Sequence, residues 1–312
     1  MTTQTSATEV AVAVHARGIR WAVAVLRTAR PRQWPKNLLV FAAPLAGASL
    51  GRRDGLLYAL AAAAAFGSAS IAVYFVNDVV DAERDRRHPR KRNRPVASGA
   101  LSRQHAVVLG AAFAAVGLAV GLLIAEPLLT AIVAGYLAMS FLYSLVLKHL
   151  PVVEVVFVAS GFLLRVLGGA AATRVPPSAW FLLVCSLGAL GVAIAKRYTE
   201  LTGLGAEAIR HRPVMRFYRP AELRVAQIAV GAGMIAAYLA WAAGEHPGAR
   251  IWHLASALPL VLALVRFGFL TGRRTGNGST PVEDLLMRDA VMLACELSWL
   301  ALFVTGLYQT GG

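Results

Sequence analysis

The chain has 312 residues, of which 57% are hydrophobic, and its mean hydropathy is +0.60. Soluble globular proteins are usually about 45–50% apolar, so this composition excludes an ordinary soluble domain. The formal net charge is +15, from 31 Lys and Arg against 16 Asp and Glu. Nucleic acid is not the expected partner of this charge, because the basic clusters lie beside apolar segments and contain few aromatic residues.

Apolar runs of about 18–25 residues recur along most of the chain, which is typical of a polytopic helical membrane protein embedded in a lipid bilayer. We expect an all-α fold with a single transmembrane domain over residues 31–312. Residues 1–30 form a predicted cytoplasmic segment. Within it, residues 7–30 alternate apolar residues with arginines, which indicates either an amphipathic helix on the inner membrane surface or a disordered tail. Nine spans are predicted, at about residues 38–50 (short), 56–78, 105–125, 128–147, 152–173, 178–195, 222–243, 251–270 and 286–308.

Positive charge is distributed unequally between the two predicted sides of the membrane. With the N-terminus inside, 25 of the 31 Lys and Arg residues lie on the predicted cytoplasmic side. The predicted external loops hold only Arg52, Arg53, Arg174 and Arg250. This asymmetry predicts a cytoplasmic N-terminus and an external C-terminus. The long connections 79–104 and 196–221 then face the cytoplasm. The frequent use of Ala and Arg suggests a high-GC bacterial genome, so the expected location is a bacterial plasma membrane.

An acidic cluster, Asn77-Asp78-Val79-Val80-Asp81-Ala82-Glu83-Arg84-Asp85, follows the second predicted span. If the helix continues through it, Asp78, Asp81 and Asp85 fall at i, i+3 and i+7 and share one face, with Asn77 at its edge. Carboxylates this close repel one another unless a cation lies between them, and Mg²⁺ prefers such oxygen ligands. The alternative is a solvated helix end whose aspartates pair with nearby arginines, namely Arg84, Arg86 and Arg87.

A basic run, Arg90-Lys91-Arg92-Asn93-Arg94, begins five residues after Asp85, the end of the acidic cluster. Guanidinium and ammonium groups are good partners for phosphate oxygens. Acidic and then basic groups at a membrane surface predict a diphosphate site bridged by a metal ion.

The segment 77–99 resembles the first acidic motif of the UbiA superfamily of intramembrane prenyltransferases. The downstream pattern of Arg94, Pro95, Ser98 and Gly99 also matches that family. The similarity covers roughly residues 30–308. It implies nine transmembrane helices around a central cavity that opens to the cytosol and the lipid, and a Mg²⁺ ion bound by Asp78, Asp81 and Asp85 as the catalytic carboxylates.

The second site departs from the commonest pattern of that family. Aromatic prenyltransferases usually carry a second Asp-rich motif after the sixth span, but here residues 195–201 read Ala-Lys-Arg-Tyr-Thr-Glu-Leu. This resembles a narrower branch, the decaprenyl-phosphate phosphoribosyltransferases, which residues 32–37, 151–154 and 161–165 also match. The resemblance implies transfer of 5-phosphoribose from phosphoribosyl pyrophosphate to a polyprenyl (decaprenyl) phosphate for synthesis of a cell-wall arabinan precursor.

Substrate-binding roles follow for residues that match the branch or flank its cavity. Lys36 has an alternative role as an interfacial anchor beside Trp34, and snorkelling alone would explain Lys148. A homo-oligomer is compatible with this interpretation. The predicted substrate-binding residues are Lys36, Asn77, Lys91, Arg94, Ser98, Tyr143, Lys148, Arg165, Lys196, Arg197 and Tyr198.

Arg165 lies deep within the fifth predicted span. A charge at that depth is costly unless it is paired or faces water, so we interpret it as a substrate-phosphate ligand. The alternative is a structural pair with Glu154 or Glu296, although Glu154 is three helical turns away and too far for direct contact.

Two other functions remain open. One is a prenyl diphosphate:aromatic acceptor prenyltransferase of the same fold, against which stands the missing second Asp-rich motif. The other is a transporter, against which stands the concentration of polar residues at one membrane face.

Overall fold

The computed structural model describes residues 7–87, 91–147, 150–211, 213–245, 247–273, 282 and 288–309, and these form helices and turns without a strand. Eight of the helices are long and apolar enough to cross a membrane. They are α3 (Arg53–Val80), α5 (Arg103–Leu123), α6 (Pro127–Leu145), α7 (Val153–Thr173), α8 (Ala179–Leu204), α10 (Pro220–Gly244), α11 (Pro247–Gly272) and α13 (Ala290–Gln309).

The expectation that residues 38–50 form a ninth spanning helix is wrong as stated. The segment consists of the 3₁₀-helix η1 (Pro31–Phe41), the short helix α2 (Ala42–Ala46) and a 3₁₀ turn, η2 (Ser49–Gly51). Proline has no backbone N–H and clashes with the preceding turn, so Pro35 just before the predicted span and Pro44 within it both disfavour a continuous α-helix.

This broken segment nevertheless runs antiparallel along α3. Arg30, which precedes it, pairs with Asp78 near the end of α3. Its other end packs on the start of α3, where a Cβ on Gly55 would lie 2.0 Å from the Ser49 carbonyl oxygen. The missing side chain of Gly55 therefore permits the close approach that returns the chain into α3.

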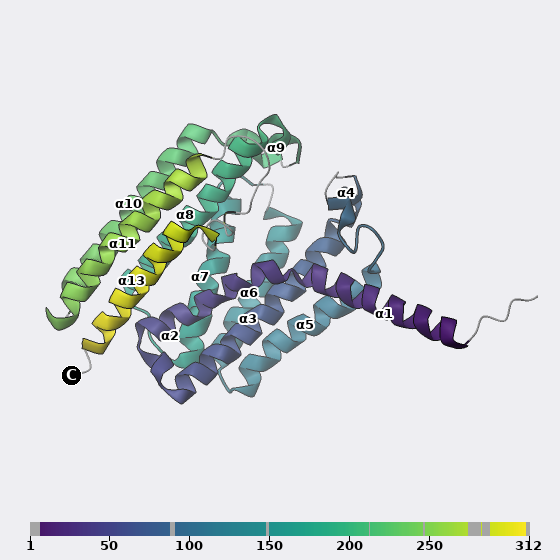
Figure 1. Cartoon of the computed structure of the whole chain (residues 1–312), viewed down its shortest axis with the longest axis horizontal. Helices are drawn as coiled ribbons and strands as arrows, with labels where there is room; N and C mark the ends of the chain where they lie inside the picture. Colours follow the sequence, from purple (N-terminus) through teal and green to yellow (C-terminus); the bar gives the residue numbers. More distant parts are fainter. Residues whose placement is uncertain are drawn as a thin grey trace, which may run out of the picture.

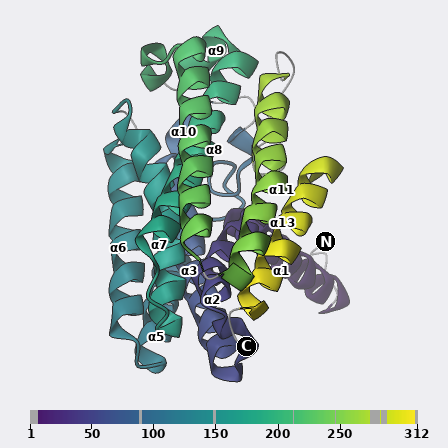
Figure 2. The same ribbon diagram turned by 90° about the vertical axis from the view of Figure 1, so that its left-hand side faces the viewer.

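Helix α3 lies at the centre of the first half of the bundle, against η1, α5, α6 and α7. Its buried residues are mostly small, which brings the neighbouring backbones close. Gly168 of α7 faces the Phe66 ring, and Gly169 faces the Val40 carbonyl so closely that a Cβ would not fit. In Figure 1, α10, α11 and α13 lie on the opposite side of the molecule from α5, and Figure 2 shows the long helices upright.

The N-terminal helix α1 (Ala7–Ala29) crosses the bundle and extends away from it (Figure 1). Ile19, Val23 and Leu26 are exposed on one face, whereas Ala24 and Ala29 are buried. The structure therefore has a helix in this segment, with an apolar face that is exposed on the protein. Its contact with the inner membrane surface stays a prediction.

Candidate active site

The acidic motif lies where α3 ends and the short helix α4 (Ala82–Arg86) begins. The helix is not continuous as expected, since Asp81 occupies a turn between the two elements. Helical spacing is still preserved, because the Asp81 N–H donates to the Asn77 carbonyl and the Asp85 N–H donates to the Asp81 carbonyl. Asp78 and Asp85 are buried, and the Asp81 side chain is 26% exposed.

Arg94 joins two of the three aspartates. Its Nη1 lies 2.7 Å from Asp85 Oδ2 and 3.6 Å from Asp78 Oδ1. Asp78 and Asp85 therefore face the same guanidinium group, as their spacing predicts. Of the pairs expected for a merely solvated helix end, Arg84 does approach Asp81, at 3.8 Å.

A second ion-pair cluster holds the loop that carries Arg94. Glu83 pairs with Arg86 at 2.7 Å and with Arg103 at 2.5 Å. Arg86 also donates through Nε to the Ala97 carbonyl at 3.1 Å. The hydrogen bonds from Arg103 and then Arg86 hold the pKa of the Glu83 carboxyl below its ordinary value. These contacts fix the loop over the end of α3, while the exposed Ser98 donates only to the Pro95 carbonyl among described residues.

Arg30 belongs to the same cluster, although we did not predict it from the sequence. Its guanidinium pairs with Asp78 and lies 5.1 Å from the centre of the Tyr74 ring. Its backbone is left-handed, with φ 53° and ψ 64°, at the junction of α1 and η1. The Trp34 indole donates to the Ala29 carbonyl and so closes the end of α1. The adjacent Pro31 predicts a chain turn here, but no sequence pattern indicates the partner.

A polar cleft of about 340 Å³ opens beside this cluster. It separates the end of α1 from the loop after the 3₁₀ turn η3 (Lys91–Asn93). The cleft is lined by Arg27, Arg30, Asp78, Asn93, Arg94 and Pro95.

Lys91 connects the acidic motif with the end of α8. Crowding by protein atoms and the nearby Arg94 lower the pKa of the Lys91 ammonium, although part of its side chain reaches solvent. Three carboxylates raise the pKa of the Lys91 ammonium and therefore lie within electrostatic reach of it: those of Asp85, Asp81 and Glu200. Glu200 is thus the acidic group that α8 contributes near the first motif.

The segment 195–201 lies in the last turns of α8, not in the loop that we expected. The helix continues until Gly205, whose φ of 52° ends it. Arg197 is buried, with Nε 2.7 Å from Glu154 Oε1 and Nη1 2.8 Å from Glu200 Oε2. Tyr198 packs beneath Arg224, whose guanidinium lies 5.8 Å from its ring centre. The predicted phosphate contacts of Lys196, Arg197 and Tyr198 stay predictions.

Arg165 lies in a separate buried network deeper in the bundle. It donates through Nε to Asn37 Oδ1 at 2.9 Å, and through Nη2 to Ser70 Oγ at 2.7 Å and Tyr136 Oη at 3.0 Å. The pairing with Glu154 is excluded because Glu154 pairs with Arg197. Among the described residues Arg165 and Glu296 make no ion pair, so Arg165 is a cation held only by neutral oxygens and by ring faces. Asn37 and Ser70 could have been suspected as polar residues within apolar segments.

Three predicted substrate-binding residues remain: Lys36, Tyr143 and Lys148. Lys36, in η1, has its Nζ 6.0 Å from the centre of the Phe162 ring. Tyr143 is half-buried in the last turn of α6. Lys148 lies outside the described residues. Their substrate contacts stay predictions.

The chemistry of the motif fits a hard divalent cation. Its possible donors are all oxygens, and Asn77 Oδ1 is buried without a hydrogen-bond partner among the described residues. No group of three or more His, Cys, Asp or Glu side chains in the described part of the chain is assembled into a metal site. Mg²⁺ commonly binds through one or two carboxylates and completes its shell with water and substrate phosphates, so Asp78 and Asp81 with Asn77 could hold it.

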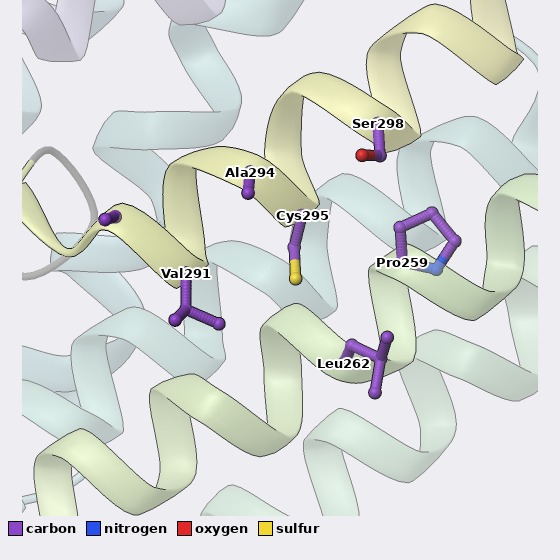
Figure 3. A pocket seen from close by; sticks show the side chains of 7 residues that line it. Pro259, Leu262, Val291, Ala294, Cys295 and Ser298 are labelled. Carbon is purple, nitrogen blue, oxygen red and sulfur yellow. The ribbon is translucent and has the colours of Figure 1, made fainter.

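An apolar pocket of about 340 Å³ lies between α11 and α13, away from the charged cluster (Figure 3). Pro259 interrupts the hydrogen bonding of α11 at this point. The side chains of Leu262 and Val291 point into the space between the two helices, and Cys295 Sγ is one of the few heteroatoms there. The lining of this pocket contains no charged side chain that could bind a phosphate group or its metal ion.

Comparison with known families matches residues 37–279 to the UbiA prenyltransferase family. The chain belongs to this family. Its fold is like that of a UbiA homologue from Archaeoglobus fulgidus bound to GPP and Mg²⁺, with a TM-score of 0.69 and 17% identity over 93% of this chain and 100% of that one. Another structure of that homologue contains Cd²⁺ and has a TM-score of 0.64. These likenesses support the UbiA fold alone.

Relatives in sequence are more informative than these structures. A decaprenyl-phosphate phosphoribosyltransferase from Mycobacterium tuberculosis (strain H37Rv) is 35% identical over 282 residues, covering 89% of this chain and 92% of the relative. The Corynebacterium glutamicum protein of the same name is 32% identical over 290 residues, covering 91% and 86%. The expected UbiA membership and all-α membrane fold are confirmed.

Proposed function

We propose that this protein transfers 5-phosphoribose from phosphoribosyl pyrophosphate to a polyprenyl phosphate and releases pyrophosphate. The specific acceptor that we propose is decaprenyl phosphate. The observation that carries the proposal is the charge composition of the two halves of the site. The first half has the acidic motif with Arg94. The second half has Lys196, and Arg197 in ion pairs with Glu154 and Glu200, in place of a second acidic cluster. The near full-length similarity to named decaprenyl-phosphate phosphoribosyltransferases supports it.

The reaction is a single displacement at the anomeric carbon. A phosphate oxygen of the lipid forms a bond to ribose C1, and the bond from C1 to pyrophosphate breaks, with the electron pair leaving on pyrophosphate. The lipid phosphate is already an anion near neutral pH, so no strong general base is needed. The protein must position the reactants and stabilise charge, which are the main contributions in group transfers of this kind.

The charged residues divide this work. Arg94 and Lys91 would donate hydrogen bonds to diphosphate oxygens as negative charge develops on them. The ion pairs of Glu83 hold the Arg94 loop in place for this role. Asp78 and Asp81, beside Asn77, would hold Mg²⁺, which when bound would neutralise the leaving diphosphate as a Lewis acid. Asp85, the third predicted ligand, would join them only if it left its pairing with Arg94.

The cellular setting is part of the proposal. The charge asymmetry supports a cytoplasmic N-terminus in a bacterial plasma membrane, with residues 1–30 as a cytoplasmic segment and residues 31–312 as one membrane domain. The active site then faces the cytoplasm, where the phosphorylated sugar donor is available. The product would serve the synthesis of a cell-wall arabinan precursor.

Phosphoribosyl pyrophosphate labelled in the ribose, added to membranes that contain the protein and a polyprenyl phosphate, tests the proposal. Labelled lipid and free pyrophosphate should appear together, and membranes containing Asp81→Asn should form neither. A parallel reaction with a prenyl diphosphate and an aromatic acceptor tests the alternative function. Prenylation of the aromatic acceptor without labelled lipid would reject the phosphoribosyl assignment.

A further inference from the structure

The cleft between the end of α1 and the Arg94 loop has an excess of positive charge. Three guanidinium groups, from Arg27, Arg30 and Arg94, line it together with one carboxylate, that of Asp78. Asp85 lies behind Arg94 and pairs with it. Even with both carboxylates counted, the group retains a net positive charge, and such a cleft concentrates anions.

Arg27 is the arginine of this cleft that makes no ion pair within the described part of the chain. Arg30 pairs with Asp78, and Arg94 is shared between Asp78 and Asp85. Among the described residues, the Arg27 guanidinium makes only a hydrogen bond of 3.4 Å to the Asn93 carbonyl. Most of its five donors are therefore available to an incoming acceptor.

The end of α1 is held firmly enough to form a binding site. Thr28 donates to the Ala24 carbonyl, and the Trp34 indole donates to the Ala29 carbonyl. Arg30 has a left-handed backbone, a strained conformation that clusters at functional sites. Its side chain is also supported by the Tyr74 ring. The arginines thus project from a fixed turn of the chain.

We propose that this cleft binds a phosphate monoester, with Arg27 and Arg30 donating hydrogen bonds to its oxygens. A monoester dianion offers three acceptor oxygens, which suits two guanidinium groups from the end of α1 that line one cleft together with Arg94. The assignment rests on the proposed function, in which both substrates carry such a group. The ligand is either the 5-phosphate of the sugar donor or the phosphate headgroup of the acceptor lipid.

Binding of two separate probes to the full chain in lipid nanodiscs distinguishes these sources. The probes are ribose 5-phosphate, which has no diphosphate, and farnesyl phosphate, a short lipid monophosphate, each titrated by calorimetry. Arg27→Gln is the principal variant, because Arg27 makes no ion pair among the described residues and its loss should leave the fold intact. Arg219→Gln is the matched control, because Arg219 is exposed and does not line the cleft, and Arg30→Lys retains the charge beside Asp78.

Arg27→Gln should weaken binding of one probe at least tenfold, the loss expected for a charge-assisted hydrogen bond, and Arg219→Gln should change it less than threefold. Binding of pyrophosphate with Mg²⁺ should change little in either variant. If binding of ribose 5-phosphate is weakened, the cleft binds the 5-phosphate of the sugar donor. If binding of farnesyl phosphate is weakened, the cleft binds the phosphate of the acceptor lipid.

The proposed phosphate site would be wrong if the wild type and Arg27→Gln bound both probes with equal affinity. It would also be wrong if neither probe showed saturable binding. The site and the reaction can fail separately. Arg27-dependent binding of a probe without transfer of labelled phosphoribose would reject the proposed function while leaving the phosphate site established.

Discussion

Arg197 of α8 and Glu154 of α7 form an ion pair in which Nε and Oε1 are 2.7 Å apart and neither side chain is more than 3% exposed. Glu154 lies in the first turn of α7, where the backbone N–H of Val152 donates to the Tyr218 hydroxyl at 2.8 Å. The pair therefore joins the cytoplasmic ends of α7 and α8, as the predicted topology places them. This gives Arg197 a structural task that its place in the sequence motif does not indicate.

Breaking this pair should destabilise the protein strongly. Arg197→Gln leaves Glu154 buried and uncompensated, which typically costs about 3–5 kcal/mol, whereas Glu154→Gln leaves Arg197 paired with Glu200 and should cost less. Arg197→Gln and Glu154→Gln should each lower the Tm in detergent, and the double variant should lose less than the sum of the two. Arg219→Gln, which removes an exposed pair with Glu222, is the control and should change stability by about 0–1 kcal/mol. An unchanged Tm in both single variants would contradict the structural role.

Replacement of Lys196 should instead weaken binding of the sugar donor, phosphoribosyl pyrophosphate. If Lys196 contacts a donor phosphate, Lys196→Ala removes one charge-assisted hydrogen bond worth roughly 1.5–3 kcal/mol. The half-saturating concentration of phosphoribosyl pyrophosphate should then rise about tenfold or more, with less change for the lipid and a nearly unchanged Tm. Steady-state kinetics with each substrate varied in turn measures this. Unchanged donor dependence would remove the main support for a cationic second half of the site.

The Asp81 side chain should be essential for turnover but dispensable for folding. Asp81 is partly exposed, so Asp81→Asn should retain the wild-type Tm while losing activity by roughly 100-fold or more, a loss typical of removed electrostatic stabilisation. EDTA should stop the wild-type reaction and added Mg²⁺ should restore it. Glu207→Gln, on the exposed helix α9 (Ala206–His211), is the control. Near-normal turnover by Asp81→Asn at ordinary Mg²⁺ would exclude a metal-binding role for this carboxylate.

Apolar periodicity located the long helices well because their burial in lipid requires continuous apolar runs. The predicted span 152–173 differs from α7 by one residue at its start. Hydropathy failed at residues 38–50, since it does not register that prolines break a helix within an apolar run. It also ended the sixth span too early, because helical hydrogen bonding continues beyond the membrane through Lys196 and Glu200 until Gly205.

Within the candidate site, local spacing was informative and long-range pairing was not. The spacing of Asp78 and Asp85 correctly predicted that they share a face, and both meet Arg94. Arg30 is 48 residues from Asp78, and a single sequence contains no signal that two such distant residues will pair. The same limit applies to Arg197 and Glu154, whose pairing depends on how α7 and α8 pack.

The start of α13 should become less stable in acid. Asp289 accepts two hydrogen bonds from Arg266, at 3.1 and 2.8 Å, and a third from the Met292 N–H. The bonds from Arg266 lower the pKa of the Asp289 carboxyl from 3.8 to about 2. A depressed pKa stabilises the folded state at pH values above 3.8, and this contribution is lost as the pH falls from 3.8 through about 2.

Thermal unfolding of the wild type and Asp289→Asn in detergent, between pH 2 and pH 6, measures this contribution. The wild type should have the higher Tm near pH 6, and the difference should shrink toward pH 2. Other carboxylates titrate in both proteins and cancel in the comparison. A Tm difference that stays constant over this range would show that the pairing of Asp289 with Arg266 does not set its titration.

The orientation in the membrane can be tested with single cysteines. After Cys185 and Cys295 are replaced by alanine, a cysteine at Arg174 or Gly248 should react with an impermeant thiol reagent added to intact cells. A cysteine at Arg92 or Glu207 should react only after the cells are lysed. All four positions are exposed on the protein, so a lack of labelling reports the membrane side rather than burial. Arg174 pairs with Glu126, which places the start of α6 and the end of α7 at one end of the bundle. Reversed labelling would overturn the charge-based topology and with it the cytoplasmic position of the acidic motif.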